Sequence, residues 1–415
     1  MQGPRLTGAT AGVAKPASVV RPAIVMAAFF GSIGAFFPYI AVYYASIDLS
    51  VESIGFLFAL QAAVSLAAAP LWGALVDQLG TVRGSLLIGA LGAALGATLL
   101  ALAPSGPLIV VGVVVLAVAG SGIIPMLDSR TVDILGADRD RYGRARAWGS
   151  AAFIVVSIAV GGLIDRVGAR GLFLVYVPGM ILAGLAGWAL LSGESRAGRR
   201  LLRVTRAEVL GLVRRRGLAI FLAGSILLWT SVAAFNTFFS IHLLGLGAPA
   251  EVVGFAWALG ALVEVPLMLT FHRIVTRVAP ERLIVVGVVA SAMRAAGFAL
   301  APNVPLTLAV APLGGVGYAL FYVGTVTFVS RNAPARLQAT AQGIFSGTAF
   351  SVGTILGSTI GGQLAGLLGL RGLFGVCAVG AALAAVVIAI GLSTSHATAP
   401  PPGLRPGPPL RGRTV

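Results

Sequence analysis

The stretch GESRAGRRLLRVTRAEVLGLVRRR, residues 193–216, divides the chain into two apolar halves. Eight of its residues are arginine, so it is too polar to lie in lipid. A helix needs about 20 mostly apolar residues to cross a bilayer. Six runs of that length precede this stretch and six follow it. The pattern predicts an all-α membrane protein with twelve transmembrane helices arranged as two six-helix bundles.

The twelve predicted spans follow one another with short polar or glycine- and proline-containing breaks. They cover residues 22–45, 52–76, 84–103, 107–128, 144–165, 171–192, 217–243, 251–275, 282–301, 305–329, 339–367 and 372–392. The domain organisation that follows is a cytoplasmic leader (1–21), an N-terminal bundle (22–192), a basic cytoplasmic central loop (193–216), a C-terminal bundle (217–393) and a Pro-rich disordered cytoplasmic tail (394–415).

The composition supports integral membrane insertion. Of the 415 residues, 58% are hydrophobic and only 10% are charged, whereas about 25% are charged in an average soluble domain. A water-soluble protein has too little interior to hide this much apolar surface. The single cysteine, Cys377, excludes an intramolecular disulfide.

The arginines and lysines predict the orientation in the membrane. With a cytoplasmic N-terminus, 25 of them fall in cytoplasmic segments and 3 in outside loops. Positive charge accumulates on the cytoplasmic side, so we expect both termini there, in a multi-pass protein of the cytoplasmic (inner) membrane. The same bias explains the net charge of +16 through topology and anionic lipid, without binding of nucleic acid.

Four charges lie at or near membrane depth, where an ionisable side chain is costly and usually functional. Asp128 and Arg146 are nine residues on either side of one cytoplasmic turn, and Glu264 and Arg294 are fifteen residues on either side of another. Each acid therefore lies at the depth of one base, which predicts one acid–base pair in each half. Alternatives remain open: Asp128 and Arg146 as interfacial loop charges, Glu264 as a protonated packed carboxyl, and Arg294 as a packing cation.

The stretch PLWGALVDQLGTVRG (70–84) joins the second and third spans. It resembles the G-x-x-x-D-x-x-G loop signature of the major facilitator superfamily, with fewer basic residues than usual. Gly73, Asp77, Gly80 and Arg83 occupy the positions of a conformational latch, in which a carboxylate bonds helix N-terminal amides and a neighbouring arginine.

A second resemblance is to one branch of that superfamily, the phenylpropionic acid transporters and the nucleoside and oligosaccharide (lactose permease type) proton symporters. It covers nearly all of residues 22–393 and rests on GAFFPYIAVYY (34–44), PLWGALVDQLG (70–80), YGRARAWGSAAF (142–153), LVEVPLM (262–268), SAMRAAGFALAPN (291–303) and ARLQATAQGIFS (335–346). The resemblance implies alternating access between two bundles, with no cofactor.

The resemblance also implies roles for individual residues. Asp128 and Arg146 match the carboxylate and arginine that hold substrate hydroxyls, and Phe153 matches the aromatic ring that stacks on a sugar. Glu264 and Arg294 match the positions involved in proton coupling. In the first span, Phe37 and Tyr39 are further candidates for lining the cavity beside Pro38, which can kink the helix.

One departure concerns the tenth span. The residues at the usual histidine and glutamate positions of a proton relay are Gly314 and Gly317. If protons are coupled, the coupling falls to Glu264 with Arg294, or to Asp128. An arginine that approaches and withdraws would let such a carboxyl release and take up a proton.

We therefore expect a monomeric secondary transporter that moves a small organic solute, namely an organic acid, sugar or nucleoside, by proton symport. The alternatives are a drug or sugar efflux antiporter and an uncoupled facilitator. A remote alternative is an intramembrane metal-dependent transferase that uses the acids of DSRTVDILGADRD (128–140). We expect no enzyme activity, no catalytic residue and no metal site.

Overall fold

The computed structural model describes residues 18–79, 81–102, 106–136, 141–191, 210–211, 214–334 and 337–397. Within these residues the regular structure is helical and contains no strand. The predicted leader, central loop and tail lie almost entirely outside the described residues.

In the described part of the first half, eight helices make six crossings. They are α1 (Val20–Phe36) with α2 (Ile40–Ser46), α3 (Val51–Leu79), α4 (Val82–Leu102), α5 (Pro107–Gly120) with α6 (Ile123–Leu135), α7 (Tyr142–Val167) and α8 (Gly171–Leu190). The second half contains α10 (Arg216–Gly245), α11 (Ala250–Ile274), α12 (Pro280–Leu300), α13 (Val304–Val310) with α14 (Leu313–Asn332), and α15 (Gln338–Ala397).

Eleven of the described segments are long and apolar enough to cross a membrane. The last of them, Thr340–Thr394, is 55 residues long and would measure about 80 Å as one straight helix, at about 1.5 Å per residue. It is broken at Gly369, where φ is +68°, a conformation open to glycine because it has no Cβ. The segment therefore crosses twice, and the twelve predicted spans are confirmed.

Two of the crossings in the first half are interrupted where the sequence carries helix-breaking residues. Pro38 lies between α1 and α2, and Gly122 lies between α5 and α6. After the second break the helix continues to Leu135, seven residues beyond the predicted end of that span. Asp128 is consequently a helical residue and does not belong to a loop.

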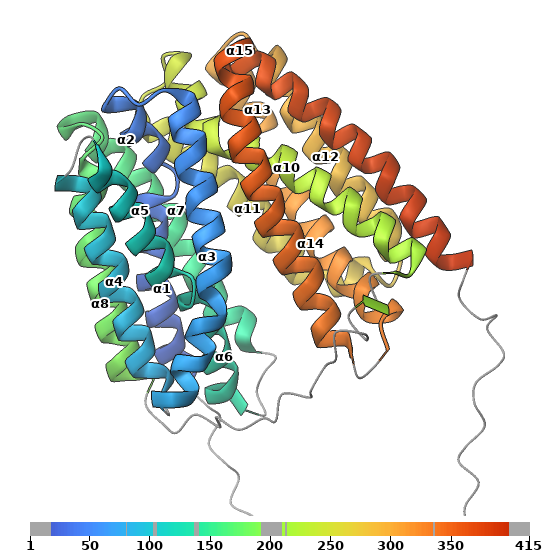
Figure 1. Cartoon of the computed structure of the whole chain (residues 1–415), viewed down its shortest axis with the longest axis horizontal. Helices are drawn as coiled ribbons and strands as arrows, with labels where there is room; N and C mark the ends of the chain where they lie inside the picture. Colours follow the sequence, from blue (N-terminus) through green and yellow to red (C-terminus); the bar gives the residue numbers. More distant parts are fainter. Residues whose placement is uncertain are drawn as a thin grey trace, which may run out of the picture.

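The outer surface of the bundles is apolar, as lipid requires. Leu174 is 66% exposed and Leu300 79% exposed, while rings such as Phe36, Tyr43 and Phe173 pack edge to face in the core of the first bundle. Figure 1 shows that the two bundles meet at one end and diverge toward the end where α6 lies.

Candidate functional site

A cavity of about 630 Å³ lies between the two bundles. Its walls come from α1, α2, α3, α6 and α7 on one side and from α10, α11, α12, α14 and α15 on the other. Aromatic, polar and charged side chains in its lining include Phe30, Phe37, Arg146, Ser150, Phe153, Trp229, Asn236, Trp257, Glu264, Arg294 and Tyr318. The cavity thus lies between the halves, and its mostly apolar lining includes ten aromatic side chains and three charged ones, Arg146, Glu264 and Arg294.

Arg146 of α7 reaches the cavity across the ring of Phe30. The guanidinium carbon lies 3.6 Å from the ring centroid, a cation–π contact. Gly149, one turn along α7, makes this possible, because a Cβ there would lie 2.8 Å from the Phe30 ring. The positive charge of Arg146 acts on Asp128 in its own half and on Glu264 in the other half. It therefore links the two predicted acids.

Asp128 is half-buried next to the cavity and is not among the residues that line it. Its Oδ1 accepts a 2.7 Å hydrogen bond from the hydroxyl of Tyr142, the first residue of α7. The sequence predicted Arg146 as the partner of Asp128, which stays a prediction, and it missed Tyr142. The quoted YGRARAWGS motif contains this tyrosine and was the available signal.

Glu264 and Arg294 both line the cavity, but each has a different neighbour from the one expected. Arg294 donates a 3.2 Å hydrogen bond from Nη1 to the Oδ1 of Asn236. Its Cζ lies 4.3 Å from the ring centroid of Phe235 and 5.1 Å from that of Phe239. The charge that acts on Glu264 is Arg146. Sequence reasoning missed the whole contribution of α10 to this site.

Gly314 and Gly317 have a structural role where the relay side chains are missing. A Cβ at Gly314 would lie 2.8 Å from the Cζ and 2.9 Å from the Nε of Arg294. A Cβ at Gly317 would collide with the hydroxyl of Ser291 on α12. The bare backbone of α14 therefore provides the surface on which the Arg294 guanidinium lies.

The aromatic candidates separate into two groups. Phe37 and Phe153 line the cavity, and the Phe37 ring packs edge to face on Trp257 at 5.0 Å. Tyr39 is fully buried and does not line it. The Tyr39 hydroxyl donates instead to the carbonyl of Ser157 at 2.5 Å and lies 3.1 Å from the carbonyl of Ala250, in the other half.

The halves contact each other at the end that carries Tyr39. Asp165, in the last turn of α7, accepts hydrogen bonds from the backbone N–H groups of Ala250 and Glu251 at the start of α11. On the other side, a Cβ at Gly362 of α15 would lie 2.9 Å from the carbonyl oxygen of Val51 in α3. This end of the cavity is closed by a few hydrogen bonds and by helices in backbone contact.

The predicted latch is described only in part. Gly80 and the side chain of Asp77 lie outside the described residues. Gly73 has open space where a Cβ would point, and the exposed Arg83 has its guanidinium carbon 5.9 Å from the ring centroid of Trp188. The latch stays a prediction.

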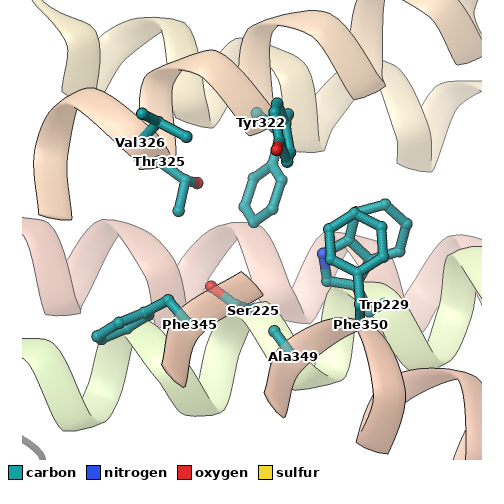
Figure 2. Close-up of a pocket in the computed structure, with 9 residues that line it drawn as sticks. Ser225, Trp229, Tyr322, Thr325, Val326, Phe345, Ala349 and Phe350 are labelled. Atoms are coloured by element: carbon teal, nitrogen blue, oxygen red, sulfur yellow. The ribbon is translucent and has the colours of Figure 1, made fainter. Parts of the chain in front are cut away.

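A small apolar hollow of about 10 Å³ lies beside the cavity, between α10, α14 and α15. Figure 2 shows Trp229 and Phe350 stacked on one side of it and Phe345 on the other; the first two ring centroids are 3.7 Å apart. Trp229, Phe321 and Phe350 line both the hollow and the main cavity. The hollow is therefore a separate small apolar space in the second bundle that shares part of its wall with the cavity.

Comparison with known proteins points in one direction. The model of the MFS_1 like family matches residues 21–376. The chain is 30% identical over 336 residues to the maltose permease of Geobacillus stearothermophilus, covering 81% of this chain and 84% of the permease. It is 26% identical over 155 residues to the probable 3-phenylpropionic acid transporter of Escherichia coli (strain K12), covering 37% and 40% of the two chains.

Solved structures share the fold. The crystal structure of the nucleoside transporter NupG superposes with a TM-score of 0.78 at 17% identity, covering 90% of this chain and 98% of that one. A bacterial homologue of the lysosomal transporter Spinster, crystallised in an inward-facing and unoccupied conformation, superposes with a TM-score of 0.70 at 14% identity, covering 91% and 97%. These proteins are transporters and not enzymes.

Proposed function

Because the chain belongs to the MFS_1-like family of the major facilitator superfamily, we propose that it is a proton-coupled symporter of a small organic solute that works by alternating access in the cytoplasmic membrane. The observation that carries this proposal is the cavity between the two bundles, lined by Arg146, Glu264 and Arg294 and closed at one end. Ionisable groups inside a membrane protein mark substrate and proton pathways.

The closed end supports the alternating-access part of the proposal. It is formed by separate helices from the two halves, joined through Tyr39 and Asp165 and through glycine contacts. Few interactions have to break for this end to open, and the rigid bundles can then rock about the cavity. With the termini in the cytoplasm, as the charge distribution predicts, the closed end faces outward and the conformation is inward-facing.

The charges of the site support a revised coupling scheme. Arg146 lines the cavity with Glu264, and Tyr142 of the same helix bonds Asp128, so in this scheme Arg146 alternates between the two acids. When Arg146 moves toward substrate or toward Asp128, Glu264 is left in a low-dielectric wall and takes up a proton. When Arg146 returns, the proton leaves. In this scheme the partner of Glu264 in coupling is Arg146.

Candidate solutes follow from the named relatives: a sugar such as maltose, an aromatic acid such as 3-phenylpropionate, or a nucleoside. A cavity of about 630 Å³ falls in the usual range for small-molecule sites, about 300–1,000 Å³. Efflux by antiport and uncoupled facilitation remain the rival functions.

The test is uptake of each of these solutes into proteoliposomes with an imposed proton gradient, acid outside. Symport predicts accumulation of at least one solute in the wild type and its loss in Glu264→Gln, while exchange of labelled for unlabelled solute continues. Asp133→Asn is the control, because Asp133 is an exposed acid of α6 outside the cavity. Solute uptake at the same rate with and without the proton gradient indicates an uncoupled facilitator. Gradient-driven accumulation of the solute only in inverted vesicles indicates efflux by antiport.

A further inference from the structure

Arg294 is held in an environment that satisfies its guanidinium only partly. Three aromatic rings surround it: the centroids of Phe235, Phe239 and Phe298 lie 4.3, 5.1 and 5.8 Å from Cζ. Its hydrogen bond to Asn236 uses one N–H, whereas a guanidinium has five. The Nε is buried and has no partner. Arg294 is therefore a positive charge with unused donors at the wall of the cavity.

Within the described residues, no side chain supplies a counter-charge to Arg294 in this conformation. In the part of the chain that the structure describes, Arg294 has Asn236 as its polar partner and forms no ion pair. Glu264, the acid on the same cavity wall, is influenced by Arg146. A desolvated charge needs a partner of opposite sign, so the missing partner of Arg294 has to enter the cavity.

The serine and threonine hydroxyls that line the cavity offer few free donors to a ligand rich in hydroxyls. Most lining hydroxyl groups already donate to carbonyl oxygens of their own helices: Ser231 to Leu227, Thr237 to Ala233, Ser291 to Gly287 and Thr354 to Phe350. Ser240 accepts from the indole of Trp257. A ligand with one strongly polar group and an apolar body fits these walls better than one that needs hydrogen bonds all round.

Gly314 determines how the guanidinium is presented. It lies over one face of the guanidinium, and any Cβ there would come within 2.9 Å of three of its atoms. Such contacts are too short for carbon against nitrogen, so a side chain at 314 would displace the guanidinium. The glycine that replaces the usual relay residue is thus a positioning residue for Arg294.

We propose that Arg294, positioned on Gly314, anchors the carboxylate of a monoanionic substrate whose aromatic or apolar body lies against Trp229 and Phe350, which line both the cavity and the small apolar hollow beside it (Figure 2). This inference rests on the proposed transport function and narrows its substrate class. The carboxylate accepts hydrogen bonds from the free guanidinium N–H groups and neutralises the charge, as arginine–carboxylate pairs do. The rings around Arg294 keep water away from that pair.

The test is a binding measurement on the purified full-length protein, using the fluorescence of the cavity tryptophans 229 and 257. The probes are phenylacetate, 3-phenylpropionate and 4-phenylbutyrate, each compared with its own neutral primary amide, together with maltose. We expect at least one acid to bind about tenfold or more tightly than its amide, the usual effect of a charged hydrogen-bonded partner. Arg294→Gln should remove that difference while leaving amide binding unchanged.

Two further variants keep the result interpretable if Arg294→Gln does not fold. Gly314→Ala should weaken acid binding without weakening amide binding, because it displaces the guanidinium and leaves the rest of the cavity intact. Arg282→Gln, an exposed arginine at the start of α12 that does not line the cavity, should change neither. Thermal unfolding of each variant reports whether it is folded.

The contrary outcomes are distinct. Absence of binding by every acid, an amide or maltose bound as tightly as the acids, or acid binding that survives both Arg294→Gln and Gly314→Ala overturns the anchor. Maltose accumulation that depends on Glu264 would refute the anchor while supporting symport. Acid binding that depends on Arg294, without gradient-driven uptake of that acid, would support the anchor and refute symport.

Discussion

The carboxylate of Asp165, in the last turn of α7, accepts a 2.7 Å hydrogen bond from the backbone N–H of Ala250, the first residue of α11 in the opposite bundle. The second oxygen accepts from the N–H of Glu251 at 3.0 Å. No side chain caps α11 from its own N-cap position, Pro249. One bundle thus supplies the helix cap of the other, and opening the closed end exposes two N–H groups of that helix.

Replacing Asp165 by Ala should favour the state that is open at this end. Loss of a helix cap costs about 1 kcal/mol, which shifts a two-state population about fivefold. Spin labels at Val167→Cys and Leu306→Cys, in a Cys377→Ala background, report the separation of the halves by pulsed electron resonance. The long-distance population should grow in Asp165→Ala and stay unchanged in Asp133→Ala, whose site is on α6 at the other end. An unchanged distance distribution in both would contradict the role of the cap.

Tyr39→Phe, like Asp165→Ala, should favour the state in which this end is open. It removes the buried hydroxyl that contacts the carbonyls of Ser157 and Ala250, at a cost of about 1–3 kcal/mol for buried groups left without a partner. The control is Tyr43→Phe, because the Tyr43 hydroxyl donates to Leu100 within the same bundle. Both variants should lower the thermal unfolding temperature, but only Tyr39→Phe should lengthen the spin-label distance. A longer distance in both would mean that the hydroxyl has no specific role between the halves.

The contact between α3 and α15 should also be sensitive to the size of the side chain at position 362. Gly362→Val inserts side-chain atoms where a Cβ alone would already lie 2.9 Å from the Val51 carbonyl oxygen and 3.1 Å from the Glu52 Cα. We expect the closed state to be lost and the long distance to dominate. Gly343→Val, on the same helix but with no atom near its missing Cβ, should behave like the wild type. A Gly362→Val protein that still populates the short distance would argue against close helix contact in the closed state.

Arg146 should not tolerate lysine. The guanidinium stacks on Phe30 at 3.6 Å and influences two carboxylates, and an ammonium group reproduces neither the flat stack nor the fork of donors. The initial rate of solute uptake should fall about 10–100-fold in Arg146→Lys, the loss of about 1.4–2.8 kcal/mol of interaction. Arg144→Lys, two residues away and exposed, should transport at the wild-type rate. Equal rates in the two variants would remove Arg146 from the site.

The spans were predictable because a hydrophobic run of fixed length is a local property. Pro38 was identified in the sequence as a point where the first span can kink, and Gly369 falls in the gap between the last two predicted spans. The end of α6 was not, because the helix continues to Leu135 through charged residues that lie beyond an apolar span. Hydropathy detects the part of a helix that lies in lipid. It does not detect the polar part of the same helix that extends beyond the lipid.

For the site, the sequence predicted only how deep in the membrane each charged residue lies. Counting residues from a turn put Glu264 and Arg294 at one level, and both do line the cavity. The rotation of each helix decides which neighbour a side chain meets, and that depends on packing against α10, whose Asn236 and Phe235 contact Arg294. Tyr39 illustrates the same limit: it was predicted to line the cavity, yet its hydroxyl lies between the two bundles, after the break at Pro38.

The central claim is that the cavity between the bundles opens to one side of the membrane at a time. The most direct measurement places a single cysteine at Ser150, a cavity residue of α7, in a Cys377→Ala background. A membrane-impermeant maleimide is then added to right-side-out or inside-out vesicles. The account predicts labelling from the cytoplasmic side in this form, and labelling from the outer side once Asp165→Ala and Tyr39→Phe are introduced. Labelling from neither side would contradict the claim. Equal labelling from both sides before Asp165 and Tyr39 are replaced would also contradict it.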